Sequence, residues 1–272
     1  MSLSFQHLGF VGLGSQGAPM ALQMLNLGVP MSLWARREAA LERFVDTAAQ
    51  VAPSLAALAQ RCDYLAICVV DDAGVRDVCD IVIPEMNAGG VIVIHSTIHP
   101  QLCRELAIEA AQRDLVLVDA PVSGGGPAAE AGQLTMMLGA PDDQVAALSA
   151  VFAPFAGDVF HLGQVGAGQQ AKLINNAMMA ANLAIAQHGL DAGASLGIDR
   201  DALVALLKSG TARSFSMEVA GRMQDPTAFK HGAALLGKDV ELLTDLLADD
   251  ATMAIRETAA RFINRALSET RL

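Results

Sequence analysis

The N-terminal part of the chain alternates between short apolar runs and longer stretches with helical periodicity. The apolar runs have the length of buried strands, and helical stretches separate most of them. Because strands that alternate with helices form a parallel sheet covered on both faces, this pattern predicts an α/β domain. The expected strands lie at residues 5–11, 29–35, 49–52, 64–70, 91–95, 115–118, 134–138 and 159–162, and the expected helices at 19–27, 38–45, 54–61, 101–113 and 142–155.

The pattern changes after residue 162, where the strand signal ends. Residues 168–196 form an Ala-rich stretch almost free of helix breakers, which predicts one helix about 40 Å long. We place a domain boundary in the Gly-rich segment 163–168, so that an all-α domain over 164–272 follows the α/β domain over 1–163, with the long helix between them. The other expected helices of the second domain lie at 200–207, 238–247 and 252–267.

Composition narrows the function classes. The 272 residues are 53% hydrophobic and 17% charged, which excludes a disordered chain. A formal net charge of −11 argues against a nucleic-acid partner, because neutralising phosphates needs a basic face. No apolar run approaches the roughly 18 residues that a membrane span needs, and no signal peptide is apparent. The four cysteines have no metal-ligand spacing, so we expect reduced thiols, no metal site and a cytoplasmic location.

A glycine-rich turn follows the first expected strand and precedes the first expected helix. It has the G-x-G-x-x-G spacing that allows a tight turn, close approach to a pyrophosphate and helix–strand packing. A purely structural Gly-rich turn is the alternative. The context predicts a Rossmann domain whose dinucleotide-binding residues are Gly12, Leu13, Gly14, Ser15, Gln16 and Gly17.

The end of the second expected strand bears on which dinucleotide is bound. An acidic residue there accepts from the ribose hydroxyls of NAD, whereas arginine accommodates the 2′-phosphate of NADP. Here the strand is followed by Arg36 and Arg37, and Glu38 is the first acid. This favours NADP, with NAD possible; the alternative is that both arginines are merely solvated.

Lysine is scarce, and the first one in the chain is Lys172. It lies four residues before Asn176 on the long expected helix, so both project from one face, with Asn175 beside them. A lysine next to two amides can exchange a proton with a hydroxyl that the amides orient. The alternative is a solvated lysine at a helix start.

A second Gly-rich turn, Ser123-Gly124-Gly125, follows another expected strand. Its backbone N–H groups could form an anion-binding nest. A flexible turn without a ligand is the other interpretation, because Gly126 and Pro127 follow.

Taken together, these motifs resemble the β-hydroxyacid dehydrogenase family, which includes 3-hydroxyisobutyrate dehydrogenase and tartronate semialdehyde reductase within the 6-phosphogluconate dehydrogenase superfamily. The resemblance covers nearly the whole chain through four ordered segments, at residues 12–21, 119–135, 166–176 and 238–240. It implies that Lys172 is the catalytic acid/base and that Asn175, Asn176 and the Ser123–Gly125 turn hold the substrate. It also implies cofactor contacts from Val69, Val70, Thr97 in the Ser96-Thr97 turn, and Lys238 near the nicotinamide.

Some positions depart from the family pattern. His95 replaces a usual carboxylate or amide, Gln16 replaces a common Met, and Ala128 replaces a common Gly. His231 stands where many members have an aromatic residue near the active site, and Arg213 lies in a segment that varies with substrate. These departures leave the reaction class intact and the particular substrate open.

We therefore expect an NADP-preferring dehydrogenase or reductase of a small 3-hydroxy carboxylate and its semialdehyde, with a lowered Lys172 pKa. An imine reductase and a non-catalytic NADP-binding module are the alternatives. A homodimer or homotetramer through the helical domain is also expected, because one small domain can hardly cover the apolar residues of the long helix. Those residues are Met178, Met179, Leu183, Ile185 and Leu190. A buried central helix within one subunit is the other interpretation.

Overall fold

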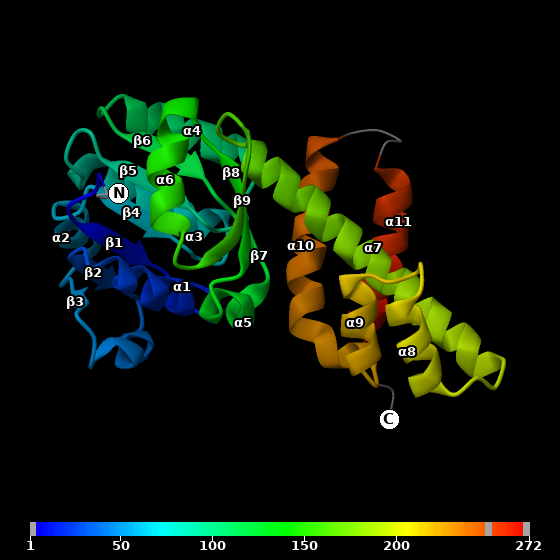
Figure 1. Cartoon of the computed structure of the whole chain (residues 1–272). Helices are drawn as coiled ribbons and strands as arrows, with labels where there is room; N and C mark the ends of the chain where they lie inside the picture. Colours follow the sequence, from blue (N-terminus) through cyan, green and yellow to red (C-terminus); the bar gives the residue numbers. More distant parts are fainter. Residues whose placement is uncertain (1–3, 248–251, 269–272) are drawn as a thin grey trace. The chain divides into compact units, whose positions relative to one another are not determined.

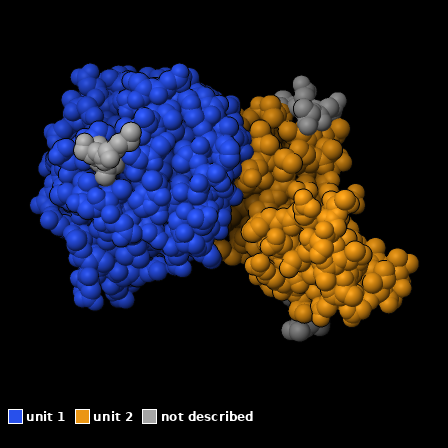
Figure 2. Space-filling view, in the orientation of Figure 1, with its two compact units in different colours: residues 1–172 blue, residues 173–272 orange. Residues whose placement is uncertain are grey.

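A computed structural model describes residues 4–247 and 252–268, so the outer ends of the two expected domains, residues 1–3 and 269–272, lie outside it. The chain divides into two compact units, residues 1–172 and 173–272 (Figure 2). The long helix α7 (Ala167–Ser195) contributes residues to both.

Unit 1 is built on a nine-stranded sheet with strand order β3-β2-β1-β4-β5-β6-β8-β7 and β9 paired with β8 (Figure 1). The first six strands pair in parallel; β8 runs antiparallel to β6 and β7. The order reverses at β1 and β4, and the carboxyl ends of the strands at such a point form the usual ligand-binding crevice. The strands are β1 (Leu8–Val11), β2 (Met31–Trp34), β3 (Gln50–Val51), β4 (Tyr64–Ile67), β5 (Val91–Ile94), β6 (Val116–Asp119), β7 (Val122–Ser123), β8 (Leu134–Gly139) and β9 (Ala156–Gly163).

Helices cover both faces of this sheet. The two faces bury separate hydrophobic cores, and successive residues of β1 belong to different ones, Phe10 to one and Val11 to the other. Both residues are fully or almost fully buried, as expected for central strands of a parallel sheet. The helices are α1 (Gly17–Met24), α2 (Leu55–Ala59), α3 (Asp72–Glu85), α4 (Pro100–Ala111), α5 (Gly125–Glu130) and α6 (Val145–Phe152).

Some local predictions for unit 1 were wrong. The helix expected at 38–45 is a 3₁₀ segment, Glu38–Phe44. The helix expected at 142–155 is a short 3₁₀ turn followed by α6, which ends at Phe152. The pattern also missed α3, although Asp71 caps it by accepting from the Gly74 amide.

Among the described residues of unit 2, the regular secondary structure is entirely helical. The long predicted helix is confirmed as α7, with 29 residues. The sequence pattern missed α9 and placed the start of α10 at 238, whereas α10 begins at Lys230. None of the described helices in either unit is both long and apolar enough to cross a membrane. The remaining helices are α8 (Arg200–Ser209), α9 (Phe215–Arg222), α10 (Lys230–Leu246) and α11 (Met253–Leu267).

The two sides of α7 differ in their environment. Leu183 and Leu190 are buried in the core of unit 2, whereas Ile174, Met178 and Ile185 are between 44% and 61% exposed. The expectation that one domain can hardly cover these residues is therefore wrong for Leu183 and Leu190, whereas Met178 and Ile185 remain exposed within one chain.

Candidate functional site

The glycine-rich turn after β1 has the geometry that a dinucleotide needs. Gly12 has a φ of 94°, and a Cβ there would meet the carbonyl oxygen of Cys68 at the end of β4. A Cβ on Gly17 would meet the Gly12 carbonyl oxygen, whereas Gly14 faces open space. The turn is thus closed toward the protein and open at its middle glycine, where backbone can approach a pyrophosphate.

The two arginines after β2 are exposed. Neither Arg36 nor Arg37 forms an ion pair with the residues that the structure describes. Both guanidinium groups are therefore available to an anionic group at this edge of the sheet.

Two further loops follow β4 and β5 at the same edge. The Val69 amide donates a hydrogen bond of 2.8 Å to Ser96 Oγ, which ties the two loops together. Val70 is 73% exposed and Thr97 is partly buried. The structure thus brings Val69, Val70 and Thr97 to the carboxyl ends of neighbouring parallel strands, whereas Lys238, also expected to contact the cofactor, lies on α10 of unit 2.

The Ser123-Gly124-Gly125 turn connects β7 to α5. Gly124 and Gly125 have φ values of 127° and 70°, which favour glycine at both positions. A Cβ on the next residue, Gly126, would lie 2.7 Å from the Ser15 carbonyl oxygen. The expected substrate turn and the dinucleotide turn therefore come into direct contact within unit 1.

Lys172 lies in the second turn of α7 and is only 8% exposed. The carboxylate of Asp119, at the end of β6, accepts from the Gly166 amide at 2.6 Å and from the Gln169 amide at 2.7 Å. These are amide groups at a helix start, which the helix itself leaves unpaired. Burial raises the pKa of Asp119 to about 6, against the lowering effect of these hydrogen bonds.

The Gln169 side chain is fully buried and bonded at both ends of its amide. Its Nε2 donates to the Ser96 carbonyl oxygen at 2.7 Å, and its Oε1 accepts from the Ile98 amide at 3.1 Å. The start of α7 is therefore joined to the loop that follows β5.

Unit 2 contributes the polar groups that follow on α7. Asn176 donates through Nδ2 to Asp239 Oδ2 at 2.5 Å and accepts from Asn175 Nδ2 at 3.0 Å. Asp239 is 3% exposed and also pairs with Lys238 at 3.1 Å. Because a carboxylate accepts only, Asp239 determines which end of the Asn176 amide is the donor. Lys238 lies in the middle of α10, so the expectation that it stands at a helix start is wrong.

Three residues of this arrangement were given no role from the sequence: Asp119, Gln169 and Asp239. All three stand inside the motifs that carry the family resemblance. A polar residue within an apolar or small-residue segment could have indicated these positions from the sequence. Asp119, which ends the apolar run of β6, is an example.

His95 departs from the family pattern and is buried beside the site. Its Nδ1 is 2.8 Å from the Ala120 carbonyl oxygen, so Nδ1 carries the proton and donates. Phe10, Phe152 and Phe155 surround the ring, and burial lowers the pKa of His95 to about 4. Two other departures from the family pattern, Arg213 and His231, belong to unit 2 and are exposed.

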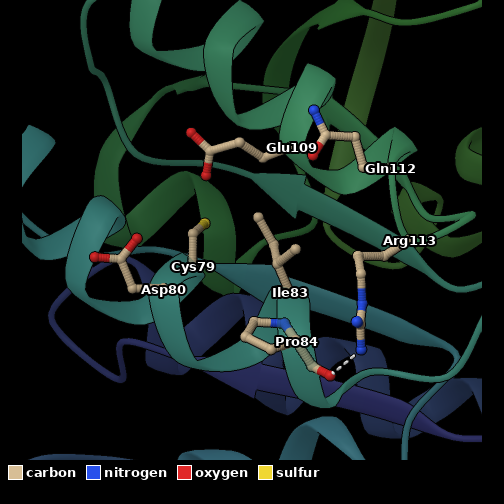
Figure 3. Close-up of a pocket in the computed structure, with 7 residues that line it drawn as sticks. All are labelled: Cys79, Asp80, Ile83, Pro84, Glu109, Gln112 and Arg113. Atoms are coloured by element: carbon tan, nitrogen blue, oxygen red, sulfur yellow. Dashed lines mark hydrogen bonds between the residues drawn. The ribbon is translucent and has the colours of Figure 1, made fainter.

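A surface pocket of about 370 Å³ lies elsewhere in unit 1, between the C-terminal halves of α3 and α4 (Figure 3). Arg113 closes one side through a 2.7 Å hydrogen bond to the Pro84 carbonyl oxygen. Crossover helices run back along the sheet, so this pocket lies at the edge opposite the dinucleotide turn. Among the described residues, no group of three His, Cys, Asp or Glu side chains could hold a metal ion.

Comparisons with protein families match both units. Residues 7–163 match the NAD binding domain of 6-phosphogluconate dehydrogenase, and residues 166–270 match a family described as NAD-binding of NADP-dependent 3-hydroxyisobutyrate dehydrogenase. Both family descriptions name NAD binding, which supports the expected nicotinamide cofactor.

Individual proteins similar to this chain are also hydroxyacid dehydrogenases. The mitochondrial 3-hydroxyisobutyrate dehydrogenase of Homo sapiens is 31% identical over 250 residues, covering 88% of this chain and 74% of the relative. The 2-(hydroxymethyl)glutarate dehydrogenase of Eubacterium barkeri is 32% identical over 214 residues, covering 78% and 71%. In fold, the chain is similar to the 3-hydroxyisobutyrate dehydrogenase of Mycobacterium tuberculosis, with a TM-score of 0.85, 24% identity, and coverage of 95% and 93%.

Proposed function

This chain belongs to the β-hydroxyacid dehydrogenase family and is a hydroxyacid dehydrogenase, and we propose that it transfers a hydride between NADP(H) and a small 3-hydroxy carboxylate or its semialdehyde. The observation that carries the proposal is the placement of Lys172. It is the only lysine of unit 1, it is buried, and it lies one helical turn before Asn176, whose amide Asp239 orients.

A bound nicotinamide supplies or accepts the hydride at the substrate carbon. Lys172 Nζ donates a proton to the carbonyl oxygen in reduction and accepts it from the hydroxyl in oxidation. Asn175 and Asn176 hold that oxygen, and the second Asn176 Nδ2 hydrogen remains to donate to it. The backbone amides of the Ser123-Gly124-Gly125 turn bind the substrate carboxylate.

The preference for NADP rests on Arg36 and Arg37. Both are exposed at the end of β2, where an arginine accommodates a 2′-phosphate, and the first acid follows them at Glu38. The family matched by the second part of the chain is described as NADP-dependent, which agrees. We expect the wild-type kcat/KM to be higher with NADPH than with NADH in parallel assays.

The helical unit is also the proposed site of self-association. Ile174, Met178 and Ile185 follow one another on α7 at spacings that place them on one face, and all three are exposed within a single chain. A homodimer or homotetramer would cover them. Light scattering should give two or four times the chain mass, and a monomer mass would contradict this part of the proposal.

Substitution of Lys172 tests the proposed reaction most directly. We expect Lys172→Ala to lower kcat by about 10²- to 10⁴-fold, because the proton-transfer group is lost. Fluorescence titration should show NADPH binding within about twofold of wild type, because the dinucleotide turn is untouched.

The assay panel should contain small 3-hydroxy carboxylates, their semialdehydes and cyclic imines. Turnover confined to imines would contradict the substrate class. Near-normal turnover by Lys172→Ala would contradict the role of the lysine.

A further inference from the structure

We propose that Asp119 and Gln169 are positioning residues that set the location of Lys172 relative to the cofactor-side loops of unit 1. The proposal rests on the proposed role of Lys172 as the acid/base. Neither residue touches the reacting atoms; both act on the first turn of α7. Asp119, Gln169 and Ser96 are called the α7 anchor below.

Asp119 joins β6 to the start of the helix. Its two carboxylate oxygens each take one amide hydrogen, from Gly166 and from Gln169, at 2.6 and 2.7 Å. Both bonds are charge-assisted when the carboxylate is ionised, and a carboxylate at a helix N-terminus is also favoured by the helix dipole. Two short bonds from one planar group determine both the distance of the helix start from β6 and its direction.

Gln169 determines the rotation of the same turn. Its side-chain amide spans the Ser96 carbonyl oxygen and the Ile98 amide, two groups of the loop after β5. Ser96 in turn accepts from the Val69 amide through its hydroxyl. A continuous chain of hydrogen bonds therefore links α7 to both loops that are expected to contact the cofactor.

The backbone packs closely around the Asp119 carboxylate. A Cβ on Gly139 of β8 would meet Asp119 Oδ1, and a Cβ on Gly168 would lie 2.9 Å from Asp119 Oδ2 and would also meet the Met137 carbonyl oxygen. Glycine at these two positions lets β8 and α7 approach the carboxylate from both sides. The anchor is therefore a close-packed contact that excludes alternative positions of the helix start.

Lys172 follows Gln169 by three residues, about 4.5 Å along the helix axis. Neighbouring turns of a helix are joined by backbone hydrogen bonds and move together, so a shift or rotation at Gln169 is transmitted to Lys172. Proton transfer needs heavy atoms within about 2.6–3.2 Å, and a misplacement of about 1 Å can cost about 10²-fold in rate. A small displacement of the anchor is expected to reduce turnover without removing any catalytic group.

The test is Gln169→Met, which retains the length of the side chain and removes both of its hydrogen bonds. Gln170→Met is the matched control, because the neighbouring Gln170 is exposed and has no side-chain hydrogen bond to the described residues. Both variants are assayed where circular dichroism shows them folded. We expect kcat of Gln169→Met to be about 10- to 100-fold below that of Gln170→Met, with the KM for NADPH within about threefold.

A solvent deuterium isotope effect on kcat separates positioning from general loosening. It should be larger in Gln169→Met than in the control, because a misplaced lysine makes proton transfer more rate-limiting. If Gln169→Met does not fold, Asp119→Asn is assayed in the same way; it retains one acceptor and places a donor against the second helix amide.

A kcat within twofold of the control, an unchanged isotope effect, or a defect confined to KM would overturn the positioning role while leaving the proposed function intact. Near-normal turnover by Lys172→Ala would overturn both proposals. The two failures are therefore distinguishable.

Discussion

The first turn of α7 and the remainder of the same helix are held by different physical means. Residues 166–169, at the start of α7, are held to the end of β6 and to the loop after β5 by four hydrogen bonds that involve the buried side chains of Asp119 and Gln169. Residues 173–195 instead pack their apolar and small side chains into the core of unit 2, with Leu173 and Ala177 fully buried. One continuous helix thus changes its mode of attachment next to Lys172.

The difference shows how positional precision and stability can be divided along one helix. Hydrogen bonds are directional and fail over a few tenths of an ångström, so they define where a residue lies. Hydrophobic burial is non-directional and roughly proportional to area, so it stabilises a helix over a range of small shifts. Lys172, the proposed acid/base, directly follows the directionally bound part of the helix.

The largest effect on stability is expected at the first turn. Gly168→Ala should destabilise the protein by about 3–6 kcal/mol, since the new methyl group would overpack against Met137 and break the Asp119 hydrogen bonds. Denaturant unfolding measures the loss. A cost below about 1 kcal/mol would show that the helix start can move away from β8 freely.

The packed part should respond as an ordinary core. Leu173→Ala is expected to cost about 2–5 kcal/mol, because it opens a cavity in unit 2. Leu235→Ala, at a 41% exposed position of α10 outside the proposed self-association face, is the matched control and should cost less than about 1 kcal/mol. In both variants the NADPH KM should stay near wild type. Equal costs for Leu173→Ala and Leu235→Ala would contradict the burial of Leu173 in the core of unit 2.

Lowering the pH should change the stability of unit 1 near the start of α7, because His95 and Asp119 have shifted pKa values there. The apolar side chains in the core of unit 2 do not titrate. His95 donates to Ala120, next to Asp119, and burial holds its pKa near 4 instead of 6.5. Between pH 6.5 and pH 4, His95 therefore binds a proton in the unfolded chain but not in the folded chain. The contribution of neutral His95 to the free energy of unfolding is therefore complete above pH 6.5. As the pH falls toward 4, the protein loses roughly 3 kcal/mol of this stability.

Asp119 acts in the opposite direction, because its pKa is raised from 3.8 to about 6. The folded chain retains that proton longer, so stability from Asp119 rises as the pH falls from 6 toward 4. His95→Asn separates the two effects, since asparagine retains a donor for Ala120 and cannot take up a proton. The stability gap between wild type and His95→Asn should shrink by roughly 3 kcal/mol from pH 7 to pH 4, and a constant gap would contradict the lowered His95 pKa.

Much of the fold could be predicted because its signals are local. The apolar runs of β1, β4 and β5 and the uninterrupted pattern of α7 are visible in the order of residues alone. The helix α3 was missed because its Asp-rich sequence and Pro84 weaken the apolar pattern, although its inward residues are buried. The early start of α10 was missed because glycine at 232 and 237 lowers helix propensity, which tertiary packing overrides.

The candidate site was predictable only in part for the same reason. The dinucleotide turn, Lys172 and Asn176 follow from spacing and residue type. The partners of these groups do not, because hydrogen bonds in a core join residues that are remote along the chain. Gln169 reaches Ser96 across 73 positions and Asn176 reaches Asp239 across 63.

The sequence by itself determined that an α/β dinucleotide-binding part precedes a helical part. It also determined that the first lysine of the chain, Lys172, lies near the start of the long helix between the two parts. Periodicity, glycine spacing and residue scarcity are properties of neighbouring positions, so they can be read without a structure. Only the tertiary structure decided that Asp119 and Gln169 bind the start of that helix and that Asp239 orients Asn176. Those outcomes depend on which polar groups are buried together, since burial makes an unpaired group costly and so selects its partner.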